Sequence, residues 1–448
     1  MSGEDELVLE LSRRGVRYLA VTWVNHTGST LVKTVSLPHM EGAAARGLGF
    51  SPVSDAFTAT GGIDPEQSLA RPDGDLRLVP DLGQVAILDE TLGWAWAPGD
   101  RRERTGAAYS ADQRSFCRRQ LEALAGAGLV MRAGFELEWV VGQETPDGTF
   151  RPAVLGSPYG ADRLVDGLDY VSAVAEALDR ASVAWLQVHP EYGPAQFEVS
   201  LPPADPLTAA DQVVLAKLVI QRATSKLGLR CSFSPVVELG TVGNGGHMHL
   251  SLEQGGVPVL SGGDGPGGLR PAGQAVVAGL LHHLPGLVPL GCALGVSYLR
   301  LVPETWSAPF VAWGIENREA ALRLVPSAVD GAPATLEYKT ADLSANPYLL
   351  VGGIAAAIVE SIATGRPLPA PVVGDPGQLP QPPDRVPVNV SQAAEALAAS
   401  ELLRDAMGER LHDTLVESRQ AEARRVASLT PEQSVASTRW WPFGEDPA

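Results

Sequence analysis

The chain has 448 residues, of which 45% are hydrophobic and 19% are charged, and its formal net charge is −18. This acidic balance disfavours nucleic acid or an anionic membrane as the main partner, because both repel a negatively charged surface. The length allows about two to three domains, and the apolar content excludes global disorder.

The first residues, "MSGEDELVLELSRRG", are acidic and lack the apolar segment of a signal peptide. Three widely spaced cysteines, Cys117, Cys231 and Cys292, match neither a disulfide framework nor a zinc motif. The most apolar run, residues 348–359, has 12 residues, whereas a membrane span needs roughly 20. We therefore expect a cytoplasmic protein in which this run forms a buried helix.

Residues 16–38 predict two strands around the turn "NHTGST". The later stretch "WAPGDRRERTGAAYS" predicts a linker between domains. Ser110 stands three residues before Gln113, a capping-box spacing that predicts the start of a helix. We therefore divide the chain into two domains, residues 1–107 and 108–448.

Strands and helices alternate through the second domain, in a mixed order without an internal repeat. The pattern predicts strands at 129–141, 246–253 and 334–342, helices at 213–228, 273–284, 347–363 and 391–426, and a Pro-rich excursion at 366–387. This order favours an α+β fold over a doubly wound parallel sheet.

Acidic residues alternate with apolar ones on two predicted strands. In "GFELEWVV", Glu136 and Glu138 share one face of the strand. In "HPEYGPAQFEVSL", Gln196 and Glu198 share a face and Glu191 lies across a Gly-Pro turn. Taken alone, each segment is explained as well or better by a solvated strand face.

Two further segments add polar residues of the same kind. In "GNGGHMHLSLE", a strand would direct His247, His249 and Ser251 to one side, and in "LEYK" it would do the same for Glu337 and Lys339. Together the segments supply five carboxylates, and carboxylates that converge without compensation repel one another. An oxygen-rich set with an imidazole favours Mg²⁺ or Mn²⁺ over zinc, and such ions usually accompany phosphoryl transfer.

Arginines provide the cations that phosphate oxygens need. "WGIENREAALRLVP" contains Arg318 and Arg323, and Arg300 lies upstream in "RLVPETWSAPF". A guanidinium offers paired donors to a carboxylate or a phosphate. A surface salt bridge explains any single arginine equally well, but several arginines beside an acidic cluster are a more specific pattern.

These segments resemble the glutamine synthetase family in five ordered motifs across about 215 residues. "FELEW" resembles the first acidic strand motif of that family. "HPEYGPAQFEVSL" resembles its H-x-E-x-G-P-G-Q-x-E segment, with Ala195 in place of a glycine. "GNGGHMHLSL", "SYLRLVP" followed by "NREAALR", and "LEYKTADLSANPYLL" resemble its histidine, arginine and last acidic motifs.

The resemblance implies an N-terminal β-grasp domain, a catalytic domain with an antiparallel sheet flanked by helices, and stacked hexameric rings, usually dodecamers, with sites between subunits. It also implies ATP as co-substrate and about two or three Mg²⁺ or Mn²⁺ ions per site. By position, Glu138, Glu191 and Glu198 would hold one metal, and Glu136, His247 and Glu337 a second. His249, Ser251, Arg318 and Arg323 would contact ATP or its phosphates, with Arg318 also catalytic, and Arg300, Gly243 and Lys339 would bind glutamate.

Two departures concern the nucleophile. Family members that use ammonia carry a glutamate on the loop after R-L-V-P, where this chain has Trp306, and a second acid in the N-terminal loop, where it has Ser51. A buried charged pair loses about 2–5 kcal/mol when one partner is truncated, and a tryptophan face returns only about 0.5–2 kcal/mol by cation–π attraction. Burial of an apolar group adds roughly 1.5–3 kcal/mol, which favours an amine that carries carbon.

The sequence therefore predicts an ATP-dependent ligase that joins the γ-carboxylate of glutamate to an organic amine through a γ-glutamyl phosphate. An ammonia-using glutamine synthetase is an alternative. Val242 and Lys339, which replace a family asparagine and arginine, leave open a specialised ligase with another carboxylate donor. A non-catalytic ring protein is disfavoured, because all six matched metal positions keep ligand-type residues.

Overall fold

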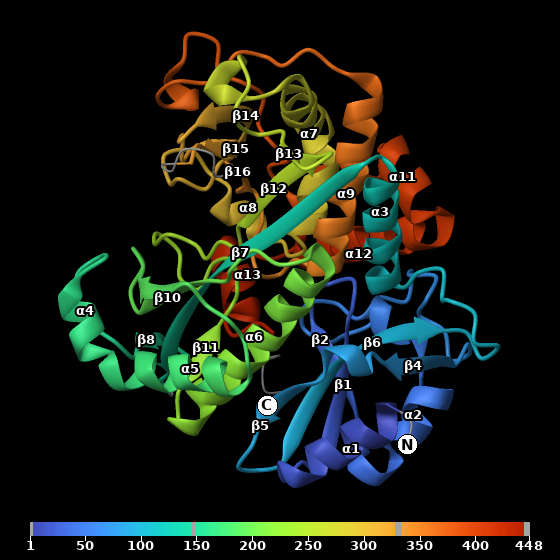
Figure 1. The fold of residues 1–448 in the computed structure, drawn as a ribbon. Helices are drawn as coiled ribbons and strands as arrows, with labels where there is room; N and C mark the ends of the chain where they lie inside the picture. Colours follow the sequence, from blue (N-terminus) through green and yellow to red (C-terminus); the bar gives the residue numbers. More distant parts are fainter. Residues whose placement is uncertain (1–2, 146–147, 328–333, 443–448) are drawn as a thin grey trace.

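A computed structural model describes residues 3–145, 148–327 and 334–442 (Figure 1). The N-terminal part forms a six-stranded sheet in the order β2-β1-β6-β4-β3, with β5 paired to β6. Its elements are α1 (Gly3–Arg13), β1 (Tyr18–Val24), β2 (Thr30–Ser36), η1 (Leu37–His39), α2 (Met40–Arg46), β3 (Leu48–Phe50), η2 (Pro52–Ala56), β4 (Leu76–Pro80), η3 (Leu82–Gln84), β5 (Ala86–Asp89) and β6 (Trp94–Arg102). The predicted strand pair at 16–38 is confirmed, as β1 and β2 pair in antiparallel register.

The predicted linker at 96–110 is wrong for its first half. Residues Trp94–Arg102 form β6, which pairs with β1 in parallel and with β4 and β5 in antiparallel register. Pro98 and Gly99 made this stretch look like a turn, but pairing on both sides outweighs the local preference. The predicted cap is also wrong, since Asp112, not Ser110, accepts the hydrogen bond from Ser115 N at 2.8 Å.

The second sheet has ten strands and carries most of the predicted site. Its main order is β14-β15-β16-β12-β7-β10-β9, while β8 and β11 pair with β7 and β13 pairs with β12. The strands are β7 (Leu129–Glu144), β8 (Phe150–Pro152), β9 (Gln187–Pro190), β10 (Gln196–Ser200), β11 (Arg230–Ser232), β12 (Met248–Gln254), β13 (Val257–Pro258), β14 (Phe310–Ile315), β15 (Ala320–Val325) and β16 (Thr335–Tyr338). Among these described strands only β14 and β15 pair in parallel, so the antiparallel expectation holds for the rest.

Eleven described α-helices belong to this part of the chain, and several of them pack against the sheet. They are α3 (Gln113–Gly126), α4 (Ala161–Asp166), α5 (Leu168–Arg180), α6 (Pro206–Lys226), α7 (Pro271–Gly291), α8 (Ser297–Arg300), α9 (Pro347–Thr364), α10 (Val390–Ala398), α11 (Glu401–Met407), α12 (Glu409–Val426) and α13 (Pro431–Thr438), with short turns η4 (Pro266–Gly268) and η5 (Pro376–Gln378). Leu137 and Trp139 of β7 are 0% and 1% exposed, and Trp139 Nε1 donates a hydrogen bond to Tyr170 of α5. The two sheets and their helices confirm the predicted α+β class.

Helix α9 is the described helix that is long and apolar enough to cross a membrane. Its 18 residues have a mean hydropathy of 1.6, but 72% of them are buried inside the molecule. It packs against α3, α6 and α7, so we interpret it as a core helix. The predicted buried helix is thereby confirmed. Cys117, Cys231 and Cys292 are also buried, and each is a free thiol.

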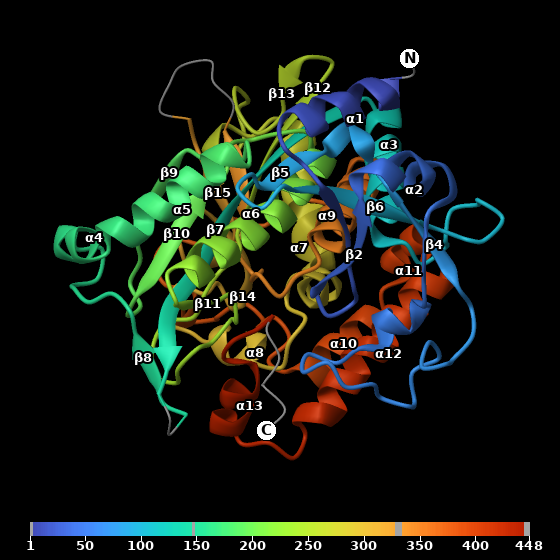
Figure 2. The same cartoon turned by 90° about the horizontal axis from the view of Figure 1, so that it is seen from below.

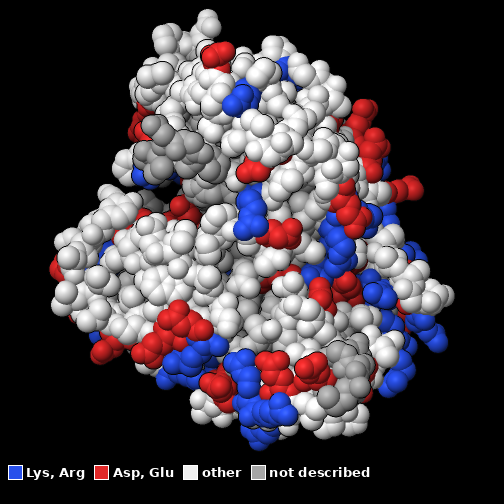
Figure 3. All heavy atoms as spheres, in the orientation of Figure 1, with Lys and Arg blue, Asp and Glu red and all other residues white. Residues whose placement is uncertain are grey.

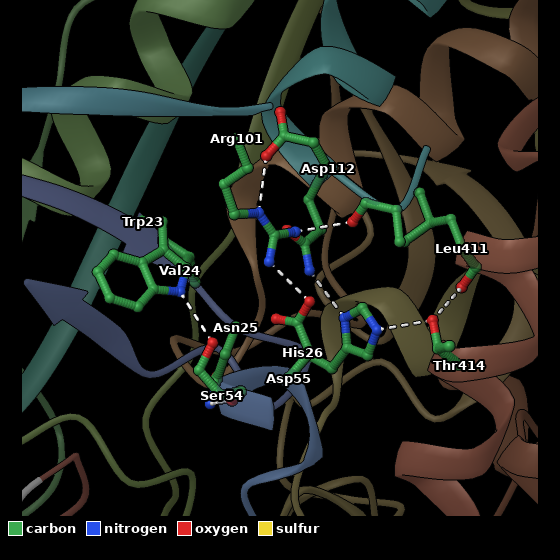
Figure 4. Close-up of polar contacts among 12 residues, drawn as sticks. Trp23, Val24, Asn25, His26, Ser54, Asp55, Arg101, Asp112, Leu411 and Thr414 are labelled. Carbon is green, nitrogen blue, oxygen red and sulfur yellow. Dashed lines mark hydrogen bonds and ion pairs between the residues drawn. The ribbon is translucent and has the colours of Figure 1, made fainter. Parts of the chain in front are cut away.

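A buried polar network joins the N-terminal sheet to the helices of the second part (Figure 4). The Arg101 guanidinium donates to Asp55 at 2.6 Å and to Asp112 at 2.8 Å. Burial lowers the pKa of His26 to about 4, which favours the neutral ring. Its Nε2 lies 2.9 Å from Thr414 Oγ1 of α12. The loop after η2 also runs along α12 (Figure 2), where Ser68 N donates to Glu417 Oε2 at 2.8 Å and Arg424 Nε lies 2.8 Å from Asp64 Oδ2.

Candidate active site

Neighbouring strands of the second sheet place charged residues opposite one another. Arg323 of β15 lies opposite Glu337 of β16, and Glu337 lies opposite His249 of β12. Across β7, Glu138 lies opposite Glu198 of β10. Because side chains alternate between the two faces of a strand, this register gathers one polar row on one face of the sheet.

A cavity of about 550 Å³ opens over this row. The predicted site residues that line it are Glu136, Glu138, Glu191, Glu198, Gly243, His247, Arg300, Trp306, Arg318, Arg323, Glu337 and Lys339. The space-filling view shows a hollow between the region of α4 and α5 and the region of β14 to β16, with acidic side chains visible there (Figure 3). The structure thus brings together residues that are distant in sequence, as predicted.

The first group of ligand-type residues lies between β7, β12 and β16. One side-chain atom each of Glu136, His249 and Glu337 lies within 4.8 Å of the others. His247 Nδ1 lies 3.1 Å from Glu136 Oε2 and 3.4 Å from Glu337 Oε1. Burial opposes ionisation of Glu136, but hydrogen bonds from the two histidines outweigh it and lower the pKa of that carboxyl. His249 therefore belongs to this group, although it was predicted to contact ATP.

The second group lies on β9, on the turn that follows it and on β10, and it includes a residue that sequence reasoning missed. Ligand atoms of His189, Glu191 and Glu198 lie within 4.8 Å of one another. A hydrogen bond to Glu198 raises the pKa of His189 to about 9. Burial and the charge of Glu198 raise the pKa of nearby Glu138 to about 8. These shifts show that the carboxylates are crowded and attract positive charge.

Two glycines leave room beside these groups. A Cβ on Gly245 would meet His247 Nε2 and would lie 2.9 Å from Glu138 Oε1. A Cβ on Gly243 would collide with Pro235 O and lie 2.6 Å from Cγ of Arg300. The glycine-rich loop before β12 therefore lets the backbone approach the carboxylates, and Gly245 N donates to Glu138 Oε2 at 2.9 Å.

Three of the predicted cations are anchored around the cavity. Arg300 is 6% exposed and donates to Ala341 O at 2.9 Å, while its Nε has no hydrogen-bond partner among the described residues. Lys339 Nζ lies 3.3 Å from Glu337 Oε1, and Arg323 Nη1 lies 3.1 Å from Glu337 Oε2. A buried guanidinium with a free donor is suited to an anionic ligand.

Aromatic rings form one wall of the cavity. Trp306 is 57% exposed, so it is not an ordinary core residue. Its ring centroid lies 6.3 Å from that of Tyr192, and Tyr192 lies 6.3 Å from Tyr159, both edge-to-face. All three line the cavity. We call Tyr159, Tyr192 and Trp306 the aromatic wall. Tyr159 and Tyr192 were missed, although Tyr192 directly follows Glu191 in the quoted motif.

Three predicted site residues do not line the cavity, and the first of them is His249, which lies beside Glu136 and Glu337 in the first group. Ser251 follows His249 on β12, opposite Arg132 of β7, and does not line the cavity. Ser51 belongs to the N-terminal part, where its hydroxyl caps η2 by accepting from Val53 N at 3.3 Å. The resemblance places its equivalent in a neighbouring subunit's site, so its role stays a prediction.

Comparison with known proteins agrees with this geometry. The sequence model of the glutamine synthetase catalytic domain matches residues 110–437. The chain belongs to the glutamine synthetase family. It is 40% identical to the gamma-glutamylpolyamine synthetase GlnA3 of Streptomyces coelicolor over 96% of this chain and 95% of that protein. It is 27% identical to the glutamate–methylamine ligase of Methyloversatilis universalis over 89% of this chain and 90% of that one.

Solved structures show the same fold. A novel glutamine synthase homologue superimposes with a TM-score of 0.84 and 28% identity, covering 94% of this chain and 97% of that chain. The ADP complex of GmaS gives a TM-score of 0.82 and 25% identity, covering 95% of this chain and 97% of that chain.

Proposed function

We propose that this protein is an ATP-dependent ligase that joins the γ-carboxylate of glutamate to an organic amine and gives a γ-glutamylamide. The observation that carries the proposal is the aromatic wall inside the carboxylate-lined cavity. The carboxylates and arginines suit phosphoryl transfer, and the wall suits a nucleophile with carbon attached. Both ligases named above are relatives along nearly the whole chain.

The two acidic groups fit divalent cations. Glu136, His247, His249 and Glu337 would hold one ion, and Glu138, Glu191 and Glu198, with His189 beside them, would hold another. The raised pKa of Glu138 and the space left by Gly245 both support positive charge at this position. When bound, Mg²⁺ or Mn²⁺ would neutralise the phosphate oxygens of ATP.

The protein's own cations would position the two anionic substrates. Arg300, with its free Nε and no room for a side chain at Gly243, would bind the α-carboxylate of glutamate. Arg318 and Arg323 would hold the transferring phosphoryl group, which moves from ATP to the γ-carboxylate. The bound ammonium first gives one proton to a neighbouring carboxylate or to water. The free amine then attacks the carbonyl carbon of the acyl phosphate, phosphate leaves, and the nitrogen gives its second proton to the departing phosphate.

The aromatic wall would shield this step from water and select the nucleophile. Trp306 and Tyr192 face the cavity beside Glu191, so a protonated amine can lie against aromatic faces near a carboxylate. Bare ammonium would gain little from these rings, because it has no apolar surface to bury.

The wider organisation is part of the same proposal. Residues 1–107 would form the β-grasp domain and 108–448 the catalytic domain, and the subunits would assemble into stacked rings in the cytoplasm. The family match, which begins at residue 110, supports this division. Ser51 would reach the site of a neighbouring subunit, and Ser251, which lies outside the cavity, would contact ATP there.

The test is an assay of phosphate release with Mg²⁺, ATP and glutamate. Ammonium is compared with methylamine, ethanolamine, n-pentylamine, 1,4-diaminobutane and aniline, and products are identified by mass spectrometry. We expect at least one amine to exceed ammonium and to yield its γ-glutamyl product. Robust turnover with ammonium and no gain from any amine would instead identify a glutamine synthetase. Turnover that requires another carboxylate in place of glutamate would identify the alternative donor.

A further inference from the structure

A second cavity of about 410 Å³ lies beside the first. Trp306 and Arg318 line both cavities, so they form the boundary between them. The rest of its lining comes from Glu304 on the loop that carries Trp306, from the end of β14 and the turn that follows it, and from the segment 371–375. The mechanism proposed above gives this second cavity no role.

Carboxylates dominate the charged lining of the second cavity. Its charged residues are Glu304, Glu316, Arg318, Glu319 and Asp375, which makes four acids and one base. An acidic cluster alone does not define a site, because exposed acids are usually solvated. One member of this set differs from the others because it is buried.

Glu319 is that buried member. It is only 6% exposed, and its Oε1 accepts from Glu304 N at 2.9 Å. Its Oε2 is buried and has no hydrogen-bond partner among the residues that the structure describes. Burial, together with the charge of Asp375, raises the pKa of Glu319. A buried carboxylate oxygen without a partner is costly, and a cationic donor in the cavity would satisfy it.

The walls of the second cavity are apolar between these charges. Ile315, Val372 and Val373 line it together with Trp306. The segment 371–375 is fixed to the β14–β15 turn, because Asn317 Nδ2 donates to Val372 O at 3.1 Å and to Gly374 O at 2.9 Å. The cavity is therefore held by specific contacts, and it suits a chain of methylene groups that ends in a cation.

We propose that the second cavity binds the distal ammonium group of a diamine or polyamine whose other amino group reacts in the first cavity. The methylene chain would cross the face of Trp306, and the distal ammonium would lie on the Glu319 side of Arg318. Glu319 Oε2 and Asp375 would accept its hydrogen bonds. This inference rests on the proposed ligase activity and narrows its substrate to amines with a second positive charge.

The experiment compares two amines of matched length and shape. In 1,4-diaminobutane the far end is an ammonium, whereas in n-pentylamine a methyl group takes its place. We expect kcat/KM for the diamine to exceed that for n-pentylamine by about tenfold. The reason is that hydrogen bonds between the distal ammonium and a carboxylate are among the stronger ones in proteins. Added KCl should raise the KM of the diamine more than that of n-pentylamine, since salt also screens the attraction of the distal ammonium, which n-pentylamine lacks.

Two variants connect this preference to the cavity. Glu319→Gln keeps an oxygen that accepts from Glu304 N, and Asp375→Asn keeps one that accepts from Gly377 N. Each should reduce the ratio of kcat/KM for the diamine to that for n-pentylamine by roughly tenfold. A general folding defect would lower both values and leave their ratio near that of the wild type. Glu122→Gln, an exposed acid on α3 outside both cavities, is the matched control and should keep the wild-type ratio.

The outcomes separate the two proposals. If n-pentylamine serves as well as the diamine in the wild-type enzyme, or if neither variant changes the ratio, the second cavity does not bind the distal ammonium, although the ligase proposal stands. If ammonium is used and no amine is, both proposals fall. The wild-type comparison needs no variant, so a variant that fails to fold leaves the inference open to refutation.

Discussion

The carboxylate row and the aromatic wall face the same cavity, but the chain builds them in different ways. Glu138 is 9% exposed and stands on a strand paired along both edges. Trp306 is 57% exposed and stands on a loop in which Glu304, Trp306 and Ala308 all have positive φ, at 66°, 54° and 61°. Such backbone conformations cost of order 1–3 kcal/mol each and occur mainly at functional sites.

The two regions correspond to the two steps of the proposed reaction, phosphoryl transfer and attack by the amine. The residues proposed for phosphoryl transfer are tied to strand register, so replacing one disturbs its neighbours across the sheet. The residues proposed to select the nucleophile stand on loops, which tolerate substitution far better. A family built in this way can keep its phosphoryl chemistry and change its amine.

The largest effect is expected on the sheet. Glu138→Gln keeps an acceptor for Gly245 N but removes a charge from the acidic groups, so we expect phosphate release to fall on the order of a thousandfold. The fold should persist, because a neutral amide relieves repulsion from Glu198. Glu253→Gln, on β12 outside the cavity, is the control. Activity near the wild-type level in Glu138→Gln would remove this carboxylate from the site and weaken the comparison.

Metal binding gives the second test, and its readout does not require turnover. Mg²⁺ or Mn²⁺ at a hundredfold excess over its Kd should stabilise the protein by about 2.7 kcal/mol, because only the folded state assembles the ligands. Thermal unfolding with and without EDTA measures this shift. The metal should stabilise the Glu138→Gln variant less than it stabilises the wild-type protein. Equal melting temperatures in metal and in EDTA would argue against a metal role for the acidic groups.

The third test moves to the loop. Trp306→Ala removes an apolar surface worth roughly 1.5–3 kcal/mol on full burial, so kcat/KM for n-pentylamine should fall about ten- to a hundredfold relative to ammonium. Trp185→Ala is the control, since Trp185 lies outside the cavity and its Nε1 donates to Asp179. If both nucleophiles lose activity equally, Trp306 supports the loop and does not select the amine.

The smallest effect concerns how the loop is held. Ser307 Oγ donates to Val302 O at 2.9 Å and lies 3.0 Å from Thr305 Oγ1. Ser307→Ala should lower the free energy of unfolding by only about 0.5–1.5 kcal/mol, as for a typical hydrogen bond. Chemical denaturation measures it. A loss several times larger would mean that the loop is as integral to the fold as the carboxylate row.

Sequence alternation predicted the faces of the strands correctly. Leu137 and Trp139 pack into the core while Glu136 and Glu138 line the cavity, as a period of two requires. Alternation contains no information on which strands pair or in what register. The pairing of Glu138 with Glu198 was therefore not predictable from either strand alone, and only the resemblance to a family placed the motifs together.

The misses have three causes. Strand β6 was taken for a linker because Pro98 and Gly99 are turn residues locally, and only pairing with three other strands makes them extended. Tyr159 and Tyr192 were overlooked because they stand on loops, where spacing does not reveal which segments meet in space. His189 was overlooked because a histidine beside a proline has many ordinary explanations.

The buried network around Arg101 ties the N-terminal sheet to the start of α3, so the chain should not fold when it is cut between them. A cut at residue 107 would leave Asp112 and Gln113 on one fragment and Arg101 and Asp55 on the other. Removing one partner of a buried ion pair typically costs about 3–5 kcal/mol, a large share of the stability of a domain. The two sheets should therefore melt in a single cooperative transition, and the catalytic part should be insoluble or unfolded when it is expressed without the residues that precede it.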